Sequence, residues 1–161
     1  MLKNSLFSAA LVMAAAGVAH AGGQAGSIGV GAEFQINGTG GASLNYDAGD
    51  FHVGGFLGFA DGDGPDNTAI DIGARFYYHV HSTAMADFGV GGSLGIVSED
   101  PPGGGDKQTL VFIEPGIQVR LFLAANVAVS ASTGVVIGTA DAGGVLFTGQ
   151  TIGAGLHYYF F

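Results

Sequence analysis

The chain has 161 residues, with thirteen acidic residues against four basic ones, no cysteine and 31 glycines. A net charge of −9 excludes the basic footprint that nucleic-acid binding needs, and the lack of cysteine excludes disulfides, thiolate catalysis and Cys-ligated zinc. The glycine content disfavours helices, while 48% hydrophobic residues are too many for a disordered chain.

Residues 1–21 have the features of a secretory signal peptide. Lys3 supplies a positive start, and an apolar run then leads to an A-x-A cleavage site at Ala19-His20-Ala21. A membrane-anchor helix would need about 20 apolar residues and a stop-transfer flank, which this segment lacks. We therefore expect an exported protein with one mature domain, residues 22–161.

The rest of the chain alternates apolar and polar residues with a period of two, in segments bounded by turn residues. Such alternation predicts β-strands with one apolar and one polar face. The predicted strands are residues 27–37, 42–48, 51–59, 69–79, 86–96, 110–122, 127–138 and 151–161. Pro115 lies inside the sixth strand and predicts a bulge there, because proline cannot donate a hydrogen bond to a neighbouring strand.

The connections between these strands alternate in length. The tight ones are residues 49–50, 80–85 and 123–126. The longer, polar ones are residues 60–68, 97–109 and 139–145, while the first connection, 38–41, is short. Short turns at one end and longer loops at the other are typical of an all-β, up-and-down transmembrane barrel.

Charged residues inside the predicted strands lie only on the polar faces. An Arg or Lys that faces lipid near the midplane costs about 2 to 4 kcal/mol, so this exclusion indicates that the apolar face meets a bilayer. Arg75 and Arg120 should then point into the barrel. If they pointed outward while Val90 and Val119 filled the middle, this orientation would be wrong.

Aromatic residues gather at the ends of the apolar faces, as they do in the girdles of membrane barrels. The girdle expected near the turns consists of Tyr46, Phe51, Phe76, Tyr78, Tyr158 and Phe160. Phe34 and Phe59 lie near the loop end. The final strand therefore finishes the chain with aromatic side chains at the interface.

A signal peptide, eight amphipathic strands and a terminal aromatic strand together resemble the small outer-membrane barrels of the outer-membrane protein A and X type. The resemblance covers residues 22–161. It implies an eight-stranded antiparallel barrel in the outer membrane of a Gram-negative bacterium, inserted by the barrel-assembly machinery. The other expected partners are the lipid bilayer and lipopolysaccharide, and we expect a monomer.

The interior of an eight-stranded barrel is just wide enough to be filled by side chains or to hold one small ligand, and charges buried there must be paired. Counting across the hairpins places Arg75 almost opposite Asp87, and Arg120 one diagonal step from Asp87. The members of the predicted lumenal charge cluster are Arg75, Asp87, Arg120, Glu33, Asp71 and Glu114. Such a cluster indicates a polar plug that replaces a core, or a gate on an ion path.

Metal and catalytic sites find little support. His52, His79 and His157 share the inward face near the turns, but they lack the local spacing of a metal site. The acidic loop 61–67 lacks the bidentate Glu of an EF-hand. The only adjacent base and nucleophile, His81-Ser82, lies in a predicted turn away from the outer leaflet. We therefore expect no metal, no cofactor and no enzymatic activity.

The sequence thus predicts an integral outer-membrane barrel with a polar, salt-bridged lumen and a structural or surface-interaction role. A narrow ion or small-solute channel is the alternative function. A soluble, secreted β-sandwich that binds apolar ligands is a third possibility, and it predicts solubility without detergent.

Overall fold

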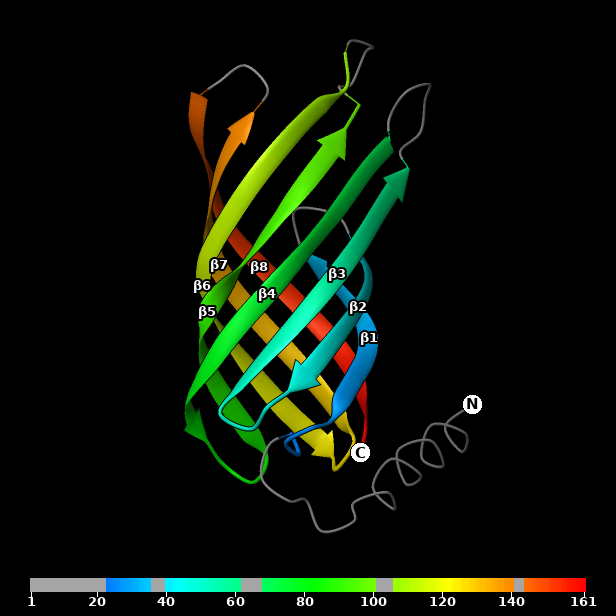
Figure 1. Cartoon of the computed structure of the whole chain (residues 1–161), viewed down its shortest axis with the longest axis vertical. Coiled ribbons are helices and arrows are strands. Elements are labelled where there is room, and N and C mark those ends of the chain that lie inside the picture. The colour runs from blue at the N-terminus through cyan, green and yellow to red at the C-terminus, as the bar shows by residue number, and fades with distance from the viewer. Residues whose placement is uncertain (1–22, 36–39, 62–67, 101–105, 141–143) are drawn as a thin grey trace, which may run out of the picture.

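The computed structural model describes residues 23–35, 40–61, 68–100, 106–140 and 144–161. These residues form eight antiparallel strands in a closed barrel, in which β1 pairs with β8 (Figure 1). The strands are β1 (Ile28–Gln35), β2 (Gly40–Asp47), β3 (Phe51–Asp61), β4 (Thr68–Ser82), β5 (Ala86–Glu99), β6 (Gln108–Ala124), β7 (Val127–Ala140) and β8 (Gly144–Phe160). The predicted fold class is confirmed.

The predicted signal peptide, residues 1–21, lies outside the described residues, as does the middle of each connection at the loop end. Among the described residues, no helix is long and apolar enough to cross a membrane.

The strands differ in length, so one wall of the barrel is taller than the other. β1 and β2 have 8 residues each, whereas β6 and β8 have 17. Most long strands extend beyond their predicted ends toward the loops, and β4 to β8 rise above β1 and β2 (Figure 1). The chain ends at Phe161 beside the tight turns.

The tight turns form with local hydrogen bonds. In the turn between β2 and β3, Gly49 has a φ of 92° and its N–H donates to Asp47 Oδ1 at 2.9 Å. In the turn between β4 and β5, the Ala86 N–H donates to Thr83 Oγ1 at 3.0 Å. The short segment before β1 is tied to the same end, because the Gly26 N–H donates to the Asp47 carbonyl at 2.7 Å.

The pairing between β6 and its neighbours stays regular at Pro115. Ile113 pairs with Ile137 and Gly116 with Gly134, with no shift of register between these two pairs. The predicted bulge at Pro115 is therefore wrong. Residues 114 and 115 have no partner on β7, because proline lacks the N–H, but the register of the strands on either side of them is the same. Register shifts lie instead at 79/81, 122/124 and 136/137.

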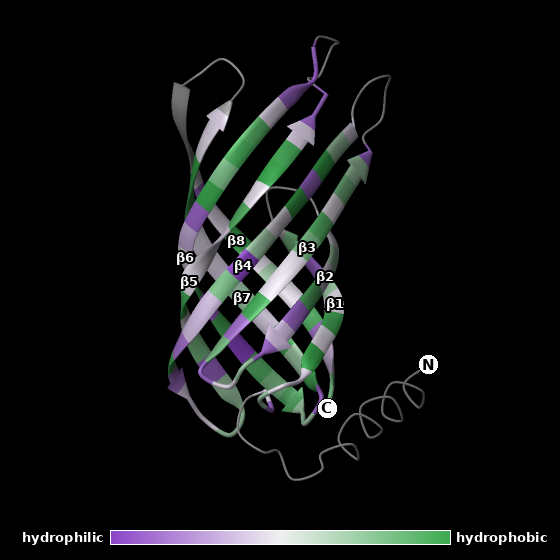
Figure 2. Ribbon diagram, viewed as in Figure 1, coloured by the Kyte–Doolittle hydropathy of each residue, from purple (hydrophilic) through white to green (hydrophobic). Residues whose placement is uncertain are grey.

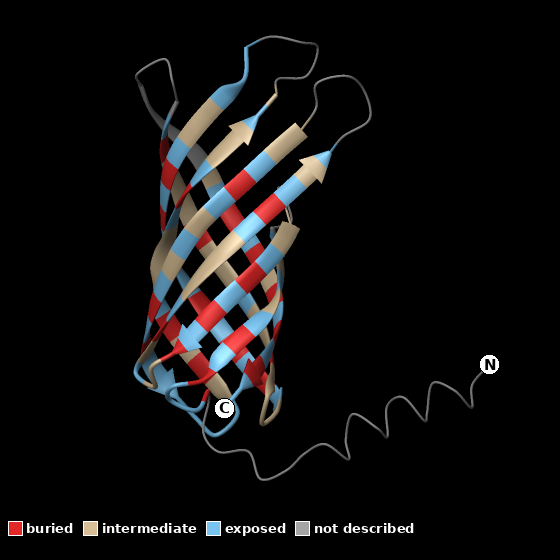
Figure 3. Cartoon of the chain, turned by 45° about the vertical axis from the view of Figure 1, so that its right-hand side comes forward, coloured by how far each residue is buried: buried red, intermediate tan, exposed pale blue. Residues whose placement is uncertain are grey.

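The barrel is polar inside and apolar outside. Among the described residues, thirteen buried side chains are polar or charged and five are apolar, while 28 large apolar side chains are exposed. Hydropathy and burial both alternate along each strand (Figures 2 and 3). Arg120 is 2% exposed, whereas Val90 and Val119 are 46% and 38% exposed. The orientation expected from the sequence is therefore confirmed.

Candidate functional site

Five consecutive strands, β2 to β6, each contribute one inward polar side chain to the turn end of the lumen. We call Asp47, His52, His79, Asp87 and Arg120 the turn-end cluster. All five are buried. The period of two places them on the inner face, and the register sets Asp87 directly opposite Arg120.

Arg120 is the centre of the turn-end cluster. Its Nη2 lies 2.7 Å from Asp47 Oδ2 and 2.6 Å from Asp87 Oδ2, so one guanidinium joins two carboxylates from different strands. Its Nη1 donates to the Tyr159 hydroxyl on β8 at 3.0 Å. Because a charge removed from water needs both a partner and hydrogen bonds, these contacts allow Arg120 to be buried.

Both ring nitrogens of His79 have hydrogen-bond partners. Its Nδ1 lies 2.7 Å from the Gly49 carbonyl oxygen, which can only accept, so Nδ1 carries the proton. Its Nε2 lies 3.1 Å from Arg120 Nη2, which can only donate, so Nε2 accepts. His52 Nδ1 lies 2.8 Å from the same Nε2. Through these contacts His79 links the β2–β3 turn to Arg120 and His52.

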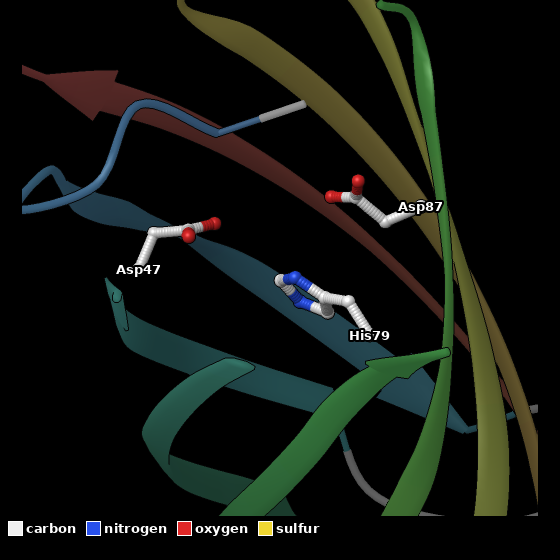
Figure 4. A group of neighbouring side chains, drawn as sticks. All are labelled: Asp47, His79 and Asp87. Atoms are coloured by element: carbon white, nitrogen blue, oxygen red, sulfur yellow. The ribbon is translucent and has the colours of Figure 1, made fainter. Parts of the chain in front are cut away.

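Asp47, His79 and Asp87 face one another in a way that resembles a metal site (Figure 4). One ligand atom from each lies within 4.8 Å of the other two. Arg120 Nη2, however, contacts all three residues, so the guanidinium already supplies the cation at their centre. A metal ion would have to displace Arg120 to bind there.

Apolar and aromatic side chains pack beside Arg120 at the turn end. Phe122, Ala128 and Tyr159 form a buried cluster, and Arg120 lies over the rings of Phe122 and Tyr159 at 5.3 and 5.9 Å. Cation–π contacts of this kind add to the ion pairs in a desolvated site. The turn end of the lumen is therefore filled by side chains.

A second group of polar side chains lies farther toward the loops. We call Glu33, Ser43, Arg75, Glu114 and His157 the mid-lumen cluster. Arg75 forms an ion pair with Glu33 and lies 4.8 Å over the Phe56 ring. Glu114 accepts hydrogen bonds from Ser93 at 2.7 Å and from Thr151. Each charged group in this cluster thus has a partner on another strand.

Ser43, His157 and Glu33 have the residue types of a hydrolase triad but a different geometry. Ser43 Oγ lies 2.6 Å from His157 Nε2, and Glu33 Oε1 lies 3.4 Å from the same nitrogen. In a triad the carboxylate binds the nitrogen opposite the one that faces serine, and so orients the ring. Here both partners meet one nitrogen, so the group cross-links β1, β2 and β8 inside the barrel.

A small polar cavity lies within the mid-lumen cluster. Its volume is about 40 Å³, and its lining includes Glu33, Asp71, Arg75 and Glu114. One water needs about 10 to 15 Å³ of such space, so the cavity has room for a few waters. The described lumen therefore combines a filled turn end with a middle that has room for a few waters.

The structure separates the charges that the sequence placed in one cluster. Arg75 pairs across the sheet with Ser93, six residues along β5 from Asp87, or about 20 Å of strand. The predicted contact between Arg75 and Asp87 is therefore wrong. β4 continues to Ser82, and Ser82 is the residue opposite Asp87, so Arg75 lies farther along the hairpin than a turn over residues 80–85 would place it. Arg120 and Asp87 do meet, as cross-strand partners rather than diagonal ones.

The remaining predicted lumenal residues fall near Arg75. Glu33 binds it, Glu114 lies in the same cavity lining, and buried Asp71 also lines that cavity. Of the three histidines, His52 and His79 contact each other, whereas His157 contacts Ser43 and Glu33.

Sequence reasoning missed Tyr159 as the eighth-strand partner of Arg120 and Ser43 as the partner of His157. Both residues occupy inward-facing positions of the alternating pattern, and this was the available signal, because a polar group inside a narrow barrel must find a partner.

The six predicted girdle residues all lie on outward positions near the turns. Phe51 is half-buried and the other five are exposed. Two pairs of rings contact each other: Phe51 with Phe76 at 5.5 Å and Tyr158 with Phe160 at 4.9 Å. This arrangement forms an aromatic belt on the described outer surface, and its place in a membrane remains a prediction.

No protein-family model matches the chain, and no curated protein matches it in sequence. Its fold is similar to the crystal structure of the N-terminal β-barrel domain of Pseudomonas aeruginosa OprF, with a TM-score of 0.63 and 15% sequence identity. The match covers 84% of this chain and 98% of that domain. At this identity the similarity establishes the fold alone.

Proposed function

We propose that this chain is an integral outer-membrane β-barrel of a Gram-negative bacterium, with a structural or surface-interaction role and no catalysis. The observation that carries the proposal is the inverted distribution of polarity, with Arg120 2% exposed and Leu94 60% exposed. A water-soluble barrel would bury Leu94 and expose Arg120. An apolar outer surface on a closed barrel suits a bilayer, because a closed sheet has no edge strand whose backbone groups would face lipid.

The same arrangement supports the proposed partners. The outward face of β8 carries Tyr158 and Phe160 beside the turns, and we propose that the barrel-assembly machinery inserts this barrel. Lipid would cover the apolar face, and lipopolysaccharide would surround the loop end. We propose a monomer, because β1 and β8 close the barrel within one chain.

Fractionation of bacteria that express the full chain tests this location. We expect the protein in the outer-membrane fraction, soluble only with detergent, with a different gel mobility before and after boiling. A soluble periplasmic or secreted protein with one mobility would refute the proposal.

A matched pair of substitutions tests which surface meets lipid. Leu94 lies near the middle of β5, whereas exposed Gln108 begins β6 at the loop end. Leu94→Arg should destabilise the barrel in phospholipid vesicles by about 2 to 4 kcal/mol, as expected near a bilayer midplane. Gln108→Arg should change the free energy of unfolding by about 0.5 kcal/mol or less, as at an ordinary surface. Equal, small effects would contradict a lipid-facing β5.

A narrow ion or small-solute channel is the second candidate, and the mid-lumen cavity, which charged side chains line in part, is the observation that favours it. Against it stands the filled turn end, where Arg120 is held by two carboxylates. We therefore expect no discrete openings from the purified protein in planar bilayers. Openings that Arg120→Ala abolishes would favour the channel instead.

A further inference from the structure

The outer face of the barrel carries a groove of about 620 Å³, which residues of β1 to β6 line. Its lining is almost entirely apolar. Its floor is formed by three small outward residues, Gly55 on β3, Ala74 on β4 and Gly92 on β5. Its walls are large outward side chains, namely Leu44, Tyr46, Val53, Phe76, Leu94 and Ile113.

The strand register brings the three small residues side by side. Gly55 pairs with Ala74, and Gly92 pairs with Phe76, two residues along β4 from Ala74. The floor therefore crosses three neighbouring strands. At a strand spacing of about 4.8 Å, it is about 10 Å long. It runs obliquely to the barrel axis because the strands of such barrels are tilted.

The backbone around position 55 does not require glycine, because it leaves room for a larger side chain. A Cβ added at Gly55 would meet nothing closer than the Gly73 carbonyl oxygen, at 3.6 Å, which is ordinary contact. At Gly92, in contrast, a Cβ would collide with the Glu114 carbonyl oxygen on β6. Glycine in a strand interior weakens the strand. A glycine that no steric clash requires therefore often marks a place where another group approaches closely. The space over Gly55 is thus a cradle that an ordinary outward side chain would fill.

We propose that this groove binds one acyl chain of a phospholipid. The inference rests on the proposed function, because the groove lies on the face assigned to lipid. Its volume falls in the range of small-molecule sites, about 300 to 1,000 Å³. A second protein chain would need about 800 Å² of buried surface on each side, far more than a floor of three residues offers.

The chemistry of the groove also suits an acyl chain. One leaflet of a bilayer is about 15 Å of hydrocarbon, so a floor of about 10 Å accommodates much of one chain. Burial of an apolar chain against Ala74 and the groove walls needs no hydrogen-bond partner. Exposed Tyr46 lies on the wall nearest the turns, where a phenol hydroxyl can reach the headgroup level.

Photo-labelling of the folded full-length protein tests the proposal. The probe is phosphatidylethanolamine with a diazirine on one acyl chain, at low content in phosphatidylethanolamine and phosphatidylglycerol vesicles. After photolysis and proteolysis, mass spectrometry locates the adducts. We expect several-fold more label on Val53, Phe76 and Leu94 than on Leu156, which is comparably exposed on β8 outside the groove.

Two alanine variants provide the matched comparison. Ala74→Leu fills the floor, whereas Ala131→Leu places the same side chain on the outward face of β7, away from the groove. We expect Ala74→Leu to reduce groove labelling several-fold and Ala131→Leu to leave it unchanged. Even labelling around the barrel, or no response to Ala74→Leu, would overturn the acyl-chain site. Failure of the wild-type chain to insert into vesicles would instead overturn the proposed function.

Discussion

Removal of the Arg120 guanidinium should destabilise the barrel more than any other single change in the lumen. In Arg120→Met, Asp47 and Asp87 would remain at 0% and 2% exposed with no cation between them. Breaking a buried ion pair by removing one partner costs about 3 to 5 kcal/mol. The Tyr159 hydroxyl also loses its donor, so we expect a loss at the upper end of that range.

Equilibrium unfolding by urea from phospholipid vesicles measures this loss. The chain has no tryptophan, so circular dichroism and gel mobility without boiling report the folded fraction. With a slope of about 1 to 3 kcal/mol per M, a loss of about 3 kcal/mol lowers the midpoint by about 1 M or more. This shift is large enough to separate the variant from the wild type.

A charge-balanced variant separates the missing charge from lost packing. In Asp47→Asn/Asp87→Asn/Arg120→Met, both carboxylates become neutral amides and the guanidinium is removed, so no uncompensated charge stays buried. We expect it to recover most of the stability lost in Arg120→Met. A loss of under about 1 kcal/mol in Arg120→Met, or a triple variant no better than the single one, would refute the argument from uncompensated charge.

Three further predictions use the same unfolding assay. Gly31→Ala places a Cβ against the β8 backbone and should cost about 1 to 3 kcal/mol, whereas Gly55→Ala has room and should be neutral or stabilising; equal effects would contradict this steric difference. Tyr159→Phe removes the acceptor of a charged donor and should cost about 1.5 to 3 kcal/mol, so an unchanged midpoint would show that this bond contributes nothing. Arg120→Ala leaves Asp47, His79 and Asp87 without the guanidinium between them. Zinc at 100 times its Kd should then stabilise the variant by about 2.7 kcal/mol and leave the wild type unchanged. The absence of a zinc-dependent shift in the variant would contradict a metal site at these three residues.

The period of two was enough to predict the strands and the face that each residue occupies. Val119 and Arg120 illustrate why: successive side chains on a strand point to opposite faces, so one assignment fixes the other. A slip of one residue would turn every side chain of a strand to the wrong side, and no such slip is compatible with the charges. The local sequence was therefore enough to predict which side chains point into the barrel and which point outward.

The partners inside the lumen could not be predicted in the same way, because they depend on register. The partner of Arg75 is Glu33 rather than Asp87, because β4 extends to Ser82 and places Ser82 opposite Asp87. The contact between Ser43 and His157 joins residues 114 positions apart, which only the closure of β1 on β8 brings together. Turn geometry, bulges and closure are set by the whole barrel.

Apart from the glycines in turns, the strand glycines Gly31 and Gly55 have two separate physical causes. At Gly31, a Cβ would collide with the Leu156 carbonyl of the neighbouring strand, so glycine there is a condition of the narrow, strongly curved barrel. At Gly55 no such collision exists, and the missing side chain only shapes the outer surface. A count of glycines cannot separate the two, whereas a Cβ placed on the folded backbone does. Selection for the barrel alone would preserve Gly31 and leave Gly55 free to change.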